Sequence, residues 1–262
     1  MKSTLNLKGG SISARNLFAG AHARKGAYTV VNEAVITVTD GTYKRIYGGG
    51  WAEKYGKSEV GSATITVSGG KLEYIYAGGA NATDGTTLVT GNVNIAVTGG
   101  AVDFVFLAGK NKECYVKGDV TLTVSGDAKT MTRISGWNAN GSSDRMTGTS
   151  TVNVNTDLTV GYLDNVDVIN IAENSLLTVQ TVFQKENLSE LTVNFVLDDE
   201  LDADWDVIAG EEIYNCLNEV STFYINGTGY TRGADGALGA SGYALLGDDT
   251  EKTFKFVAVS QQ

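Results

Sequence analysis

The chain repeats itself at a fixed interval. Residues 64–79, TITVSGGKLEYIYAGG, return in altered form as NIAVTGGAVDFVFLAG in residues 94–109. The same order of alternating strand, tight turn and second strand recurs every 27 to 31 residues, with turns at Gly10, Gly41, Gly70, Gly100 and Asp127. A period of this length is typical of a solenoid, in which repeats stack because no single repeat can bury its own apolar face.

Each repeat is expected to contain three strands. In residues 64–67, Ile65 and Val67 share one face and the two threonines share the other. A second strand follows the glycines, a polar loop of variable length comes next, and a third strand precedes the next repeat. The pattern predicts an all-β protein, a parallel β-helix of about 29 residues per coil. The hexapeptide repeats usual in left-handed helices do not occur, so we expect a right-handed one.

Equivalent positions in successive repeats are expected to lie directly over one another. An inward aliphatic stack is predicted from the residues of one register, Leu17, Ile46, Ile75, Val105 and Ile134. An aromatic column beside it is predicted from the residues that follow them, Phe18, Tyr47, Tyr76 and Phe106. The chain contains no proline, which fits an uninterrupted hydrogen-bonded ladder, because proline cannot donate to a sheet.

The repeat is regular over only part of the chain. We expect a repeat β-helix over residues 1–160, looser coils over residues 161–197, and a cap rich in β-hairpins over residues 198–262. INGTGY and LGDDTEKT place turn residues between alternating strands, as hairpins do. Such a cap would cover the exposed strand edges of the last coil. In KENLSEL we expect one short turn of helix.

Composition argues against several classes of function. A net charge of −10 repels phosphate backbones, so we expect no nucleic-acid partner. The longest apolar runs are too short to span a bilayer, so we expect no membrane insertion. His22 is the only histidine, which leaves no histidine-dependent triad or multi-histidine metal site, and the spacing of Cys114 and Cys216 matches no metal or redox motif. No cofactor is predicted.

The repeat also resembles a known family. Repeats of the form (T/V)ITV(T/S)GG…(I/V)YGGG…V.G are similar to the glycine-rich repeats in passenger segments of bacterial autotransporter-like surface proteins. The closing segment, with DADWDVIAG, LNEVSTFYINGTGYT and GYALLGDDTEKTFKFVAV, resembles the end of such passengers. The resemblance implies a secreted or surface-displayed bacterial protein, often an adhesin or a filamentous scaffold, and it implies no particular ligand.

Two carboxylates are the catalytic candidates. Lys44, Glu73 and Asp103 occupy equivalent positions in successive coils, which places neighbours about 5 Å apart. Carboxylates at about 5–5.5 Å can act as acid and nucleophile in a retaining glycosidase. We favour a solvated ladder in which Lys44 offsets Glu73, because no further cluster of charged residues converges there by register.

The aromatic column has two interpretations. If its rings point inward they are core, which we favour; if they point outward they form a platform on which sugar rings can stack. Trp51, Tyr55 and Trp137 follow glycine turns and are expected to be exposed near the same edge. The candidate binding residues are therefore Tyr47, Trp51, Tyr55, Tyr76, Phe106 and Trp137.

The segment DDELDADWD, residues 198–206, is strongly acidic. In an extended strand Asp202, Asp204 and Asp206 would point the same way and could offer oxygen ligands to Ca²⁺. The segment lacks the glycine and the distal glutamate of an EF-hand loop, so we favour a solvated acidic loop without a metal.

Together these patterns predict a non-enzymatic bacterial surface or extracellular protein. We expect an adhesin-like or scaffold module that makes contacts through stacked side-chain ladders and variable loops, with a glycan or a surface protein of a host or neighbouring cell as partner. Two alternatives stay open. One is a fibre subunit that stacks end to end through an open solenoid end, and the other is a polysaccharide-cleaving glycoside hydrolase or lyase.

Overall fold

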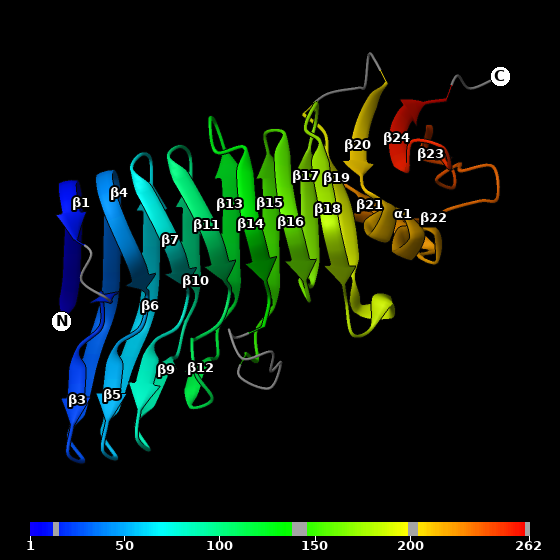
Figure 1. Cartoon of the computed structure of the whole chain (residues 1–262). Helices are drawn as coiled ribbons and strands as arrows, with labels where there is room; N and C mark the ends of the chain where they lie inside the picture. The colour runs from blue at the N-terminus through cyan, green and yellow to red at the C-terminus, as the bar shows by residue number, and fades with distance from the viewer. Residues whose placement is uncertain (13–15, 138–145, 199–203, 260–262) are drawn as a thin grey trace.

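The protein is an elongated stack of parallel strands (Figure 1). The computed structural model describes residues 1–12, 16–137, 146–198 and 204–259. Within these residues the chain forms a β-solenoid of about seven turns, with successive coils roughly 29 residues apart. In register order, Ile36 of β4 (Tyr28–Tyr47) lies beside Ile65 of β6 (Lys57–Val67), which lies beside Ile95 of β10 (Val93–Val97). The predicted parallel β-helix and its period are confirmed, and its right-handedness stays a prediction.

Two walls run the length of the stack. The first wall is built from the alternating strands: β1 (Lys2–Ile12), the middle of β4, the end of β6, β10, β13 (Val120–Ser125), β15 (Ser150–Asn155), β17 (Val168–Ala172), β19 (Thr192–Val196) and β21 (Thr222–Ile225). The second wall is built from the strands after the turns: β2 (Leu17–Phe18), the end of β4, β7 (Lys71–Tyr76), β11 (Ala101–Phe106), β14 (Thr130–Ser135), β16 (Leu158–Asp164), β18 (Leu177–Gln184) and β20 (Trp205–Ala209). Because β4 continues from one wall into the other, both belong to one sheet.

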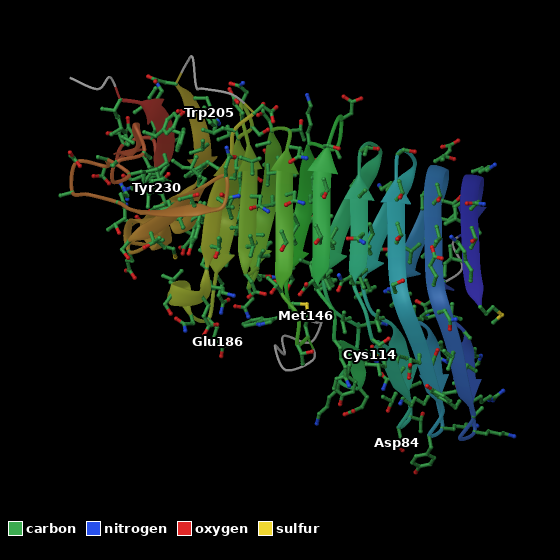
Figure 2. All side chains as sticks on the ribbon, turned by 180° about the vertical axis from the view of Figure 1, so that it is seen from behind. Asp84, Cys114, Met146, Glu186, Trp205 and Tyr230 are labelled. Carbon is green, nitrogen blue, oxygen red and sulfur yellow. The ribbon has the colours of Figure 1, made fainter. Side chains whose placement is uncertain are left out.

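The early coils carry a side lobe. Its outgoing strands were predicted as polar loops, whereas its returning strands are the predicted third strand of each repeat. The polar loops after the second wall contain short parallel strands, β3 (His22–Arg24), β5 (Trp51–Glu53) and β8 (Ala80–Ala82), which form a separate small sheet. The chain returns to the first wall through the beginnings of β4 and β6, then β9 (Thr86–Val89) and β12 (Cys114–Val116). Figure 1 shows this lobe projecting from one side of the stack, and Figure 2 labels Asp84 and Cys114 within it.

The core lies between the two walls and repeats rung by rung. Ile46, Ile75, Val105 and Ile134 are paired in register and are completely buried, which confirms these members of the predicted aliphatic stack. Leu17, the fifth predicted member, pairs with Ile46 but is only half-buried. Ile65 is buried in the first wall opposite them, while the threonines beside it are not. Each coil thus contributes one layer, and each layer is closed only by the coils above and below.

The coil shortens after β15. Asn153 of β15 pairs with Asn170 of β17 only 17 residues later, and Asn170 pairs with Asn194 of β19 after 24 residues. The side lobe is replaced here by direct turns from the second wall to the first. Asn153, Asn170 and Asn194 are joined by Nδ2-to-Oδ1 hydrogen bonds of 2.7 and 3.0 Å along the outer face of the first wall. The coils in this part of the chain are therefore shorter than the earlier ones.

A mixed cap follows the last coils. Both predicted hairpins are present: β21 with β22 (Thr228–Thr231), joined by Asn226-Gly227 with both residues at positive φ, and β23 (Tyr243–Asp248) with β24 (Thr253–Ala258). KENLSEL contains a 3-10 turn, η1 (Leu188–Glu190), as expected. The helix α1 (Glu211–Asn218) was not predicted. It follows β20 in the chain and buries Ile213, Tyr214 and Leu217. The sequence carries helix signals here, since Glu211 and Glu212 lie in the first turn and the apolar residues share one face, but so short a helix depends on tertiary packing.

Candidate functional site

The outer face of the second wall carries a ladder of aromatic and cationic side chains. We call Arg45, Tyr74, Phe104, Arg133 and Tyr162 the outer ladder; they pair in register from β4 to β16 and are all half-buried. The rings of Tyr74 and Phe104 are stacked with centroids 4.8 Å apart. The guanidinium carbons of Arg45 and Arg133 lie 5.1 Å and 4.7 Å from the ring centroids of Tyr74 and Tyr162. Contacts of this kind hold the rings against the sheet.

One of the arginines is also held by a carboxylate. Arg133 Nε lies 3.0 Å from Asp164 Oδ2, and Asp164 is buried. Burial raises the pKa of Asp164, and the charge of Arg133 opposes that rise. Arg45 Nε is buried and has no hydrogen-bond partner among the described residues. Of the two guanidinium groups in the outer ladder, that of Arg133 is therefore anchored by a carboxylate, whereas Arg45 Nε is not.

The two catalytic candidates lie beside this ladder. Glu73 and Asp103 sit on adjacent strands β7 and β11, at positions next to Tyr74 and Phe104, and both are half-exposed. Lys44 Nζ lies 3.6 Å from Glu73 Oε2, as expected for the solvated ladder. With Lys71 they line an open groove of about 380 Å³ along the second wall. The structure thus brings the predicted charges together in a surface groove.

The aromatic column lies outside the main core but is largely buried beneath the side lobe. Phe18, Tyr47, Tyr76 and Phe106 stack with centroid distances of 4.4, 4.7 and 5.2 Å, and the exposed fractions of Tyr47, Tyr76 and Phe106 are 0, 2 and 6%. Neighbouring residues on a strand face opposite sides, so these rings leave the main core and fill a second, smaller core under the side lobe. The prediction of a sugar-stacking platform is therefore wrong for Tyr47, Tyr76 and Phe106, because a ligand cannot reach these buried rings.

The remaining aromatic candidates lie at three different places. Trp51 is half-buried against Phe18, at 5.7 Å between centroids. Tyr55 is 76% exposed at the tip of the side lobe. Trp137 lines a separate pocket described below. The structure therefore does not gather the six predicted residues into one surface.

The acidic segment is only partly described. Asp202 lies outside the described residues. Asp204 and Asp206 are both exposed at the start of β20, and Asp204 Oδ2 lies 3.4 Å from Lys255 Nζ. Among the residues that the structure describes, no group of three or more His, Cys, Asp or Glu side chains is placed to hold a metal ion.

A polar pocket of about 450 Å³ lies where the coils shorten. We call it the step pocket, because the lobe ends at Met146 and Gly148 while the next two turns, 165–167 and 185–190, stay closer to the walls. Figure 2 shows Met146 and Glu186 on the same side of the stack. The residues that carry its chemistry are Trp137, Asn165, Asp167, Lys185, Glu186 and Glu190. A solenoid of constant coil length has an even edge, so this recess follows from the change in coil length.

An ion pair between a buried lysine and a partly exposed aspartate forms one wall of the step pocket. The side chain of Lys185 is only 5% exposed, and its Nζ lies 2.5 Å from Asp167 Oδ1. Asp167 Oδ2 accepts hydrogen bonds from the backbone N–H (2.8 Å) and Oγ (2.7 Å) of the buried Ser150. Burial alone would raise the pKa of Asp167, but the hydrogen bonds from Lys185 and Ser150 outweigh it and lower that pKa. The carboxylate is thus ionised and fixed in place.

Sequence reasoning found one of the step-pocket residues, Trp137, and missed Asp167 and Lys185. Those two belong to coils whose spacings depart from the 29-residue period, so alignment of repeats does not bring them together. The one sequence signal available is the break in the period itself after Asn155.

Comparison with protein-family models, curated protein sequences and solved structures gave no significant match to this chain. In the described part of the chain, no helix is both long enough and apolar enough to cross a membrane.

Proposed function

We propose that the protein is a non-enzymatic, adhesin-like or scaffold module of the bacterial cell surface or extracellular space, and that the second wall is its contact face. The outer ladder supports this proposal. Aromatic rings and arginine are the side chains most enriched in protein contact sites, and here they lie half-exposed on five successive rungs.

The first wall offers an internal comparison. Its outward positions in the same coils hold small polar side chains, such as Thr37, Thr66 and Thr123. Packing of Tyr74 and Phe104 against the aromatic column explains the buried part of these rings, but it does not explain the part of each ring that stays exposed. A contact function explains the difference, and the natural partner is a surface protein of a host or neighbouring cell.

The test is adhesion. Beads coated with the intact chain are incubated with bacterial and epithelial cells and counted by flow cytometry. We expect wild-type beads to adhere above albumin-coated beads, the pair Tyr74→Ser and Phe104→Ser to lose adhesion, and the first-wall pair Thr66→Ala and Thr123→Ala to retain it. Circular dichroism checks that both variants fold. Equal adhesion by the two variants overturns the assignment of the face.

The non-enzymatic part of the proposal has its own test. Wild type and the double variant Glu73→Gln, Asp103→Asn are incubated with plant and bacterial polysaccharides, and new reducing ends and unsaturated products are measured. We expect no release by either. Release by wild type that the double variant abolishes would show a polysaccharide-cleaving enzyme instead.

The difference between the two ends favours a second candidate, self-association. In the described chain β1 has a parallel partner, β4, on one side only, whereas β22 and β24 pair in antiparallel fashion with the last rungs. The ends are not complementary, so two copies would meet through β1 and form a closed pair rather than a fibre. Sedimentation over a dilution series tests this: a monomer–dimer equilibrium is expected, and either a monomer throughout or long polymers would contradict it.

A further inference from the structure

The step pocket has the size and chemistry of a ligand site. Its volume of about 450 Å³ falls within the range of small-molecule sites, roughly 300–1,000 Å³. None of its lining residues is a catalytic candidate, and none belongs to the outer ladder. What it binds is therefore a question separate from the proposed function.

The lining of the step pocket contains two buried hydrogen-bond donor groups. The indole Nε1 of Trp137 is buried without a hydrogen-bond partner among the described residues. Lys185 carries three N–H donors, and within the described chain its Nζ is bonded to Asp167. A buried donor without an acceptor is destabilising, so a ligand oxygen that reaches either group from the pocket would stabilise the bound state.

The rim supplies acceptors. Glu186 and Glu190 are exposed at the mouth of the pocket, and Asn187 Nδ2 donates to Glu190 Oε1 at 2.9 Å. Trp137 and Met146 add apolar surface to the lining. A ligand that suits these groups has hydroxyls that both donate and accept, together with an apolar face, which is the chemistry of a sugar ring.

The net charge of the pocket lining narrows the class of sugar further. One cation, Lys185, faces three carboxylates in the lining, those of Asp167, Glu186 and Glu190, so the site is net negative. Acidic sugars such as uronates would be repelled. We infer that the step pocket binds a neutral saccharide, with Trp137 and Lys185 donating to its hydroxyl oxygens and the rim glutamates accepting from its hydroxyls.

The experiment titrates the intact chain with a panel of neutral disaccharides (maltose, cellobiose, lactose and chitobiose) and with glucuronic acid, followed by calorimetry and tryptophan fluorescence. We expect at least one neutral disaccharide to bind, and glucuronic acid to bind at least about tenfold more weakly. Trp137→Phe removes one donor and is expected to weaken binding by about tenfold. Trp51→Phe, on the side lobe, is the matched control and leaves affinity unchanged.

Two further variants keep the inference open to refutation. Lys185→Met leaves Asp167 without its partner and can unfold this corner, so the exposed rim variant Glu190→Ala serves beside it and is expected to weaken binding without changing stability. No binding by any of the four disaccharides, preference for glucuronic acid, or affinity that ignores both Trp137→Phe and Glu190→Ala overturns the inference. The double variant Tyr74→Ser, Phe104→Ser is expected to bind the saccharide normally, which separates this site from the second-wall face.

Discussion

At the scale of single residues, the buried tyrosines link the fold to pH. Burial raises the pKa of Tyr76 from 10.0 to about 12 and raises that of Tyr47 as well. A buried hydroxyl that keeps its proton in the folded state, but loses it more readily in the unfolded state, favours the fold at neutral pH. That contribution is complete below about pH 10 and is lost as the pH rises towards the folded-state pKa.

We therefore expect alkaline unfolding that depends on Tyr76. Circular dichroism and phenolate absorbance, followed from about pH 9 upward, should show Tyr76→Phe unfolding at a higher pH than wild type, because phenylalanine has no proton to lose. Tyr55→Phe is the control, since Tyr55 is 76% exposed. Identical unfolding of both variants would contradict the role of burial.

Close backbone approach explains some of the glycines. A Cβ on Gly49 would lie 2.4 Å from the backbone nitrogen of Gly79 in the next coil, closer than atoms can approach. We expect Gly49→Ala to lower the free energy of unfolding by roughly 1–3 kcal/mol, measured by urea denaturation, because two coils must separate to make room. Gly26 sits in an open turn at φ +74° with nothing near its Cβ position, so Gly26→Asn is expected to change it by less than about 0.5 kcal/mol. A smaller effect at Gly49 than at Gly26 would refute this reading of the contact.

At the scale of elements, the asparagine ladder holds the shortened coils in register. Asn170 donates to Asn153 and accepts from Asn194, so Asn170→Ala removes two hydrogen bonds at once and leaves two partners unmet. We expect a loss of about 1–3 kcal/mol in the free energy of unfolding by urea. Asn94→Ala is the comparison, because Asn94 is exposed on the same wall in an earlier coil. Equal losses at the two positions would show that the ladder adds nothing.

The elements that sequence predicts well are those that repeat or that follow a local rule. Ile46, Ile75 and Val105 could be placed in one stack because each sits at the same offset from its turn, and the hairpin at Asn226-Gly227 follows from residues that adopt positive φ. The helix α1 has weaker local signals: Glu211 and Glu212 lie in its first turn, but Gly210 gives it no side-chain cap, and so short a helix depends on the burial of Ile213 and Leu217. Asp167 and Lys185 of the step pocket lie on coils of unequal length, so the repeat period in the sequence does not predict that they are close.

At the scale of the whole molecule, the cap closes one end of the solenoid. Phe256 of β24 is completely buried and packs against Phe195 and Trp205 at centroid distances of 4.7 and 5.2 Å. We expect Phe256→Ala to cost about 3–5 kcal/mol locally and to detach the cap. The freed edge of β20 should then pair between molecules, so light scattering on heating should rise earlier than in wild type. Leu246→Ala on the exposed face of the same hairpin should not advance it, and an equal effect there would contradict the prediction.

Because each coil contacts only the coils on either side of it, the length of the protein changes in steps of one whole coil. Thr64 and Asn94 occupy the same place in adjacent layers, so excising residues 64–93 would bring Ala63 directly onto Asn94 with every rung still in step. The product would be a rod shorter by about 4.8 Å. It would keep the cap and the step pocket and have one aromatic rung fewer on the second wall, because Tyr74 and Tyr76 lie within the excised residues. Such a protein can change its length in evolution by gaining or losing one coil, without changes elsewhere in the fold.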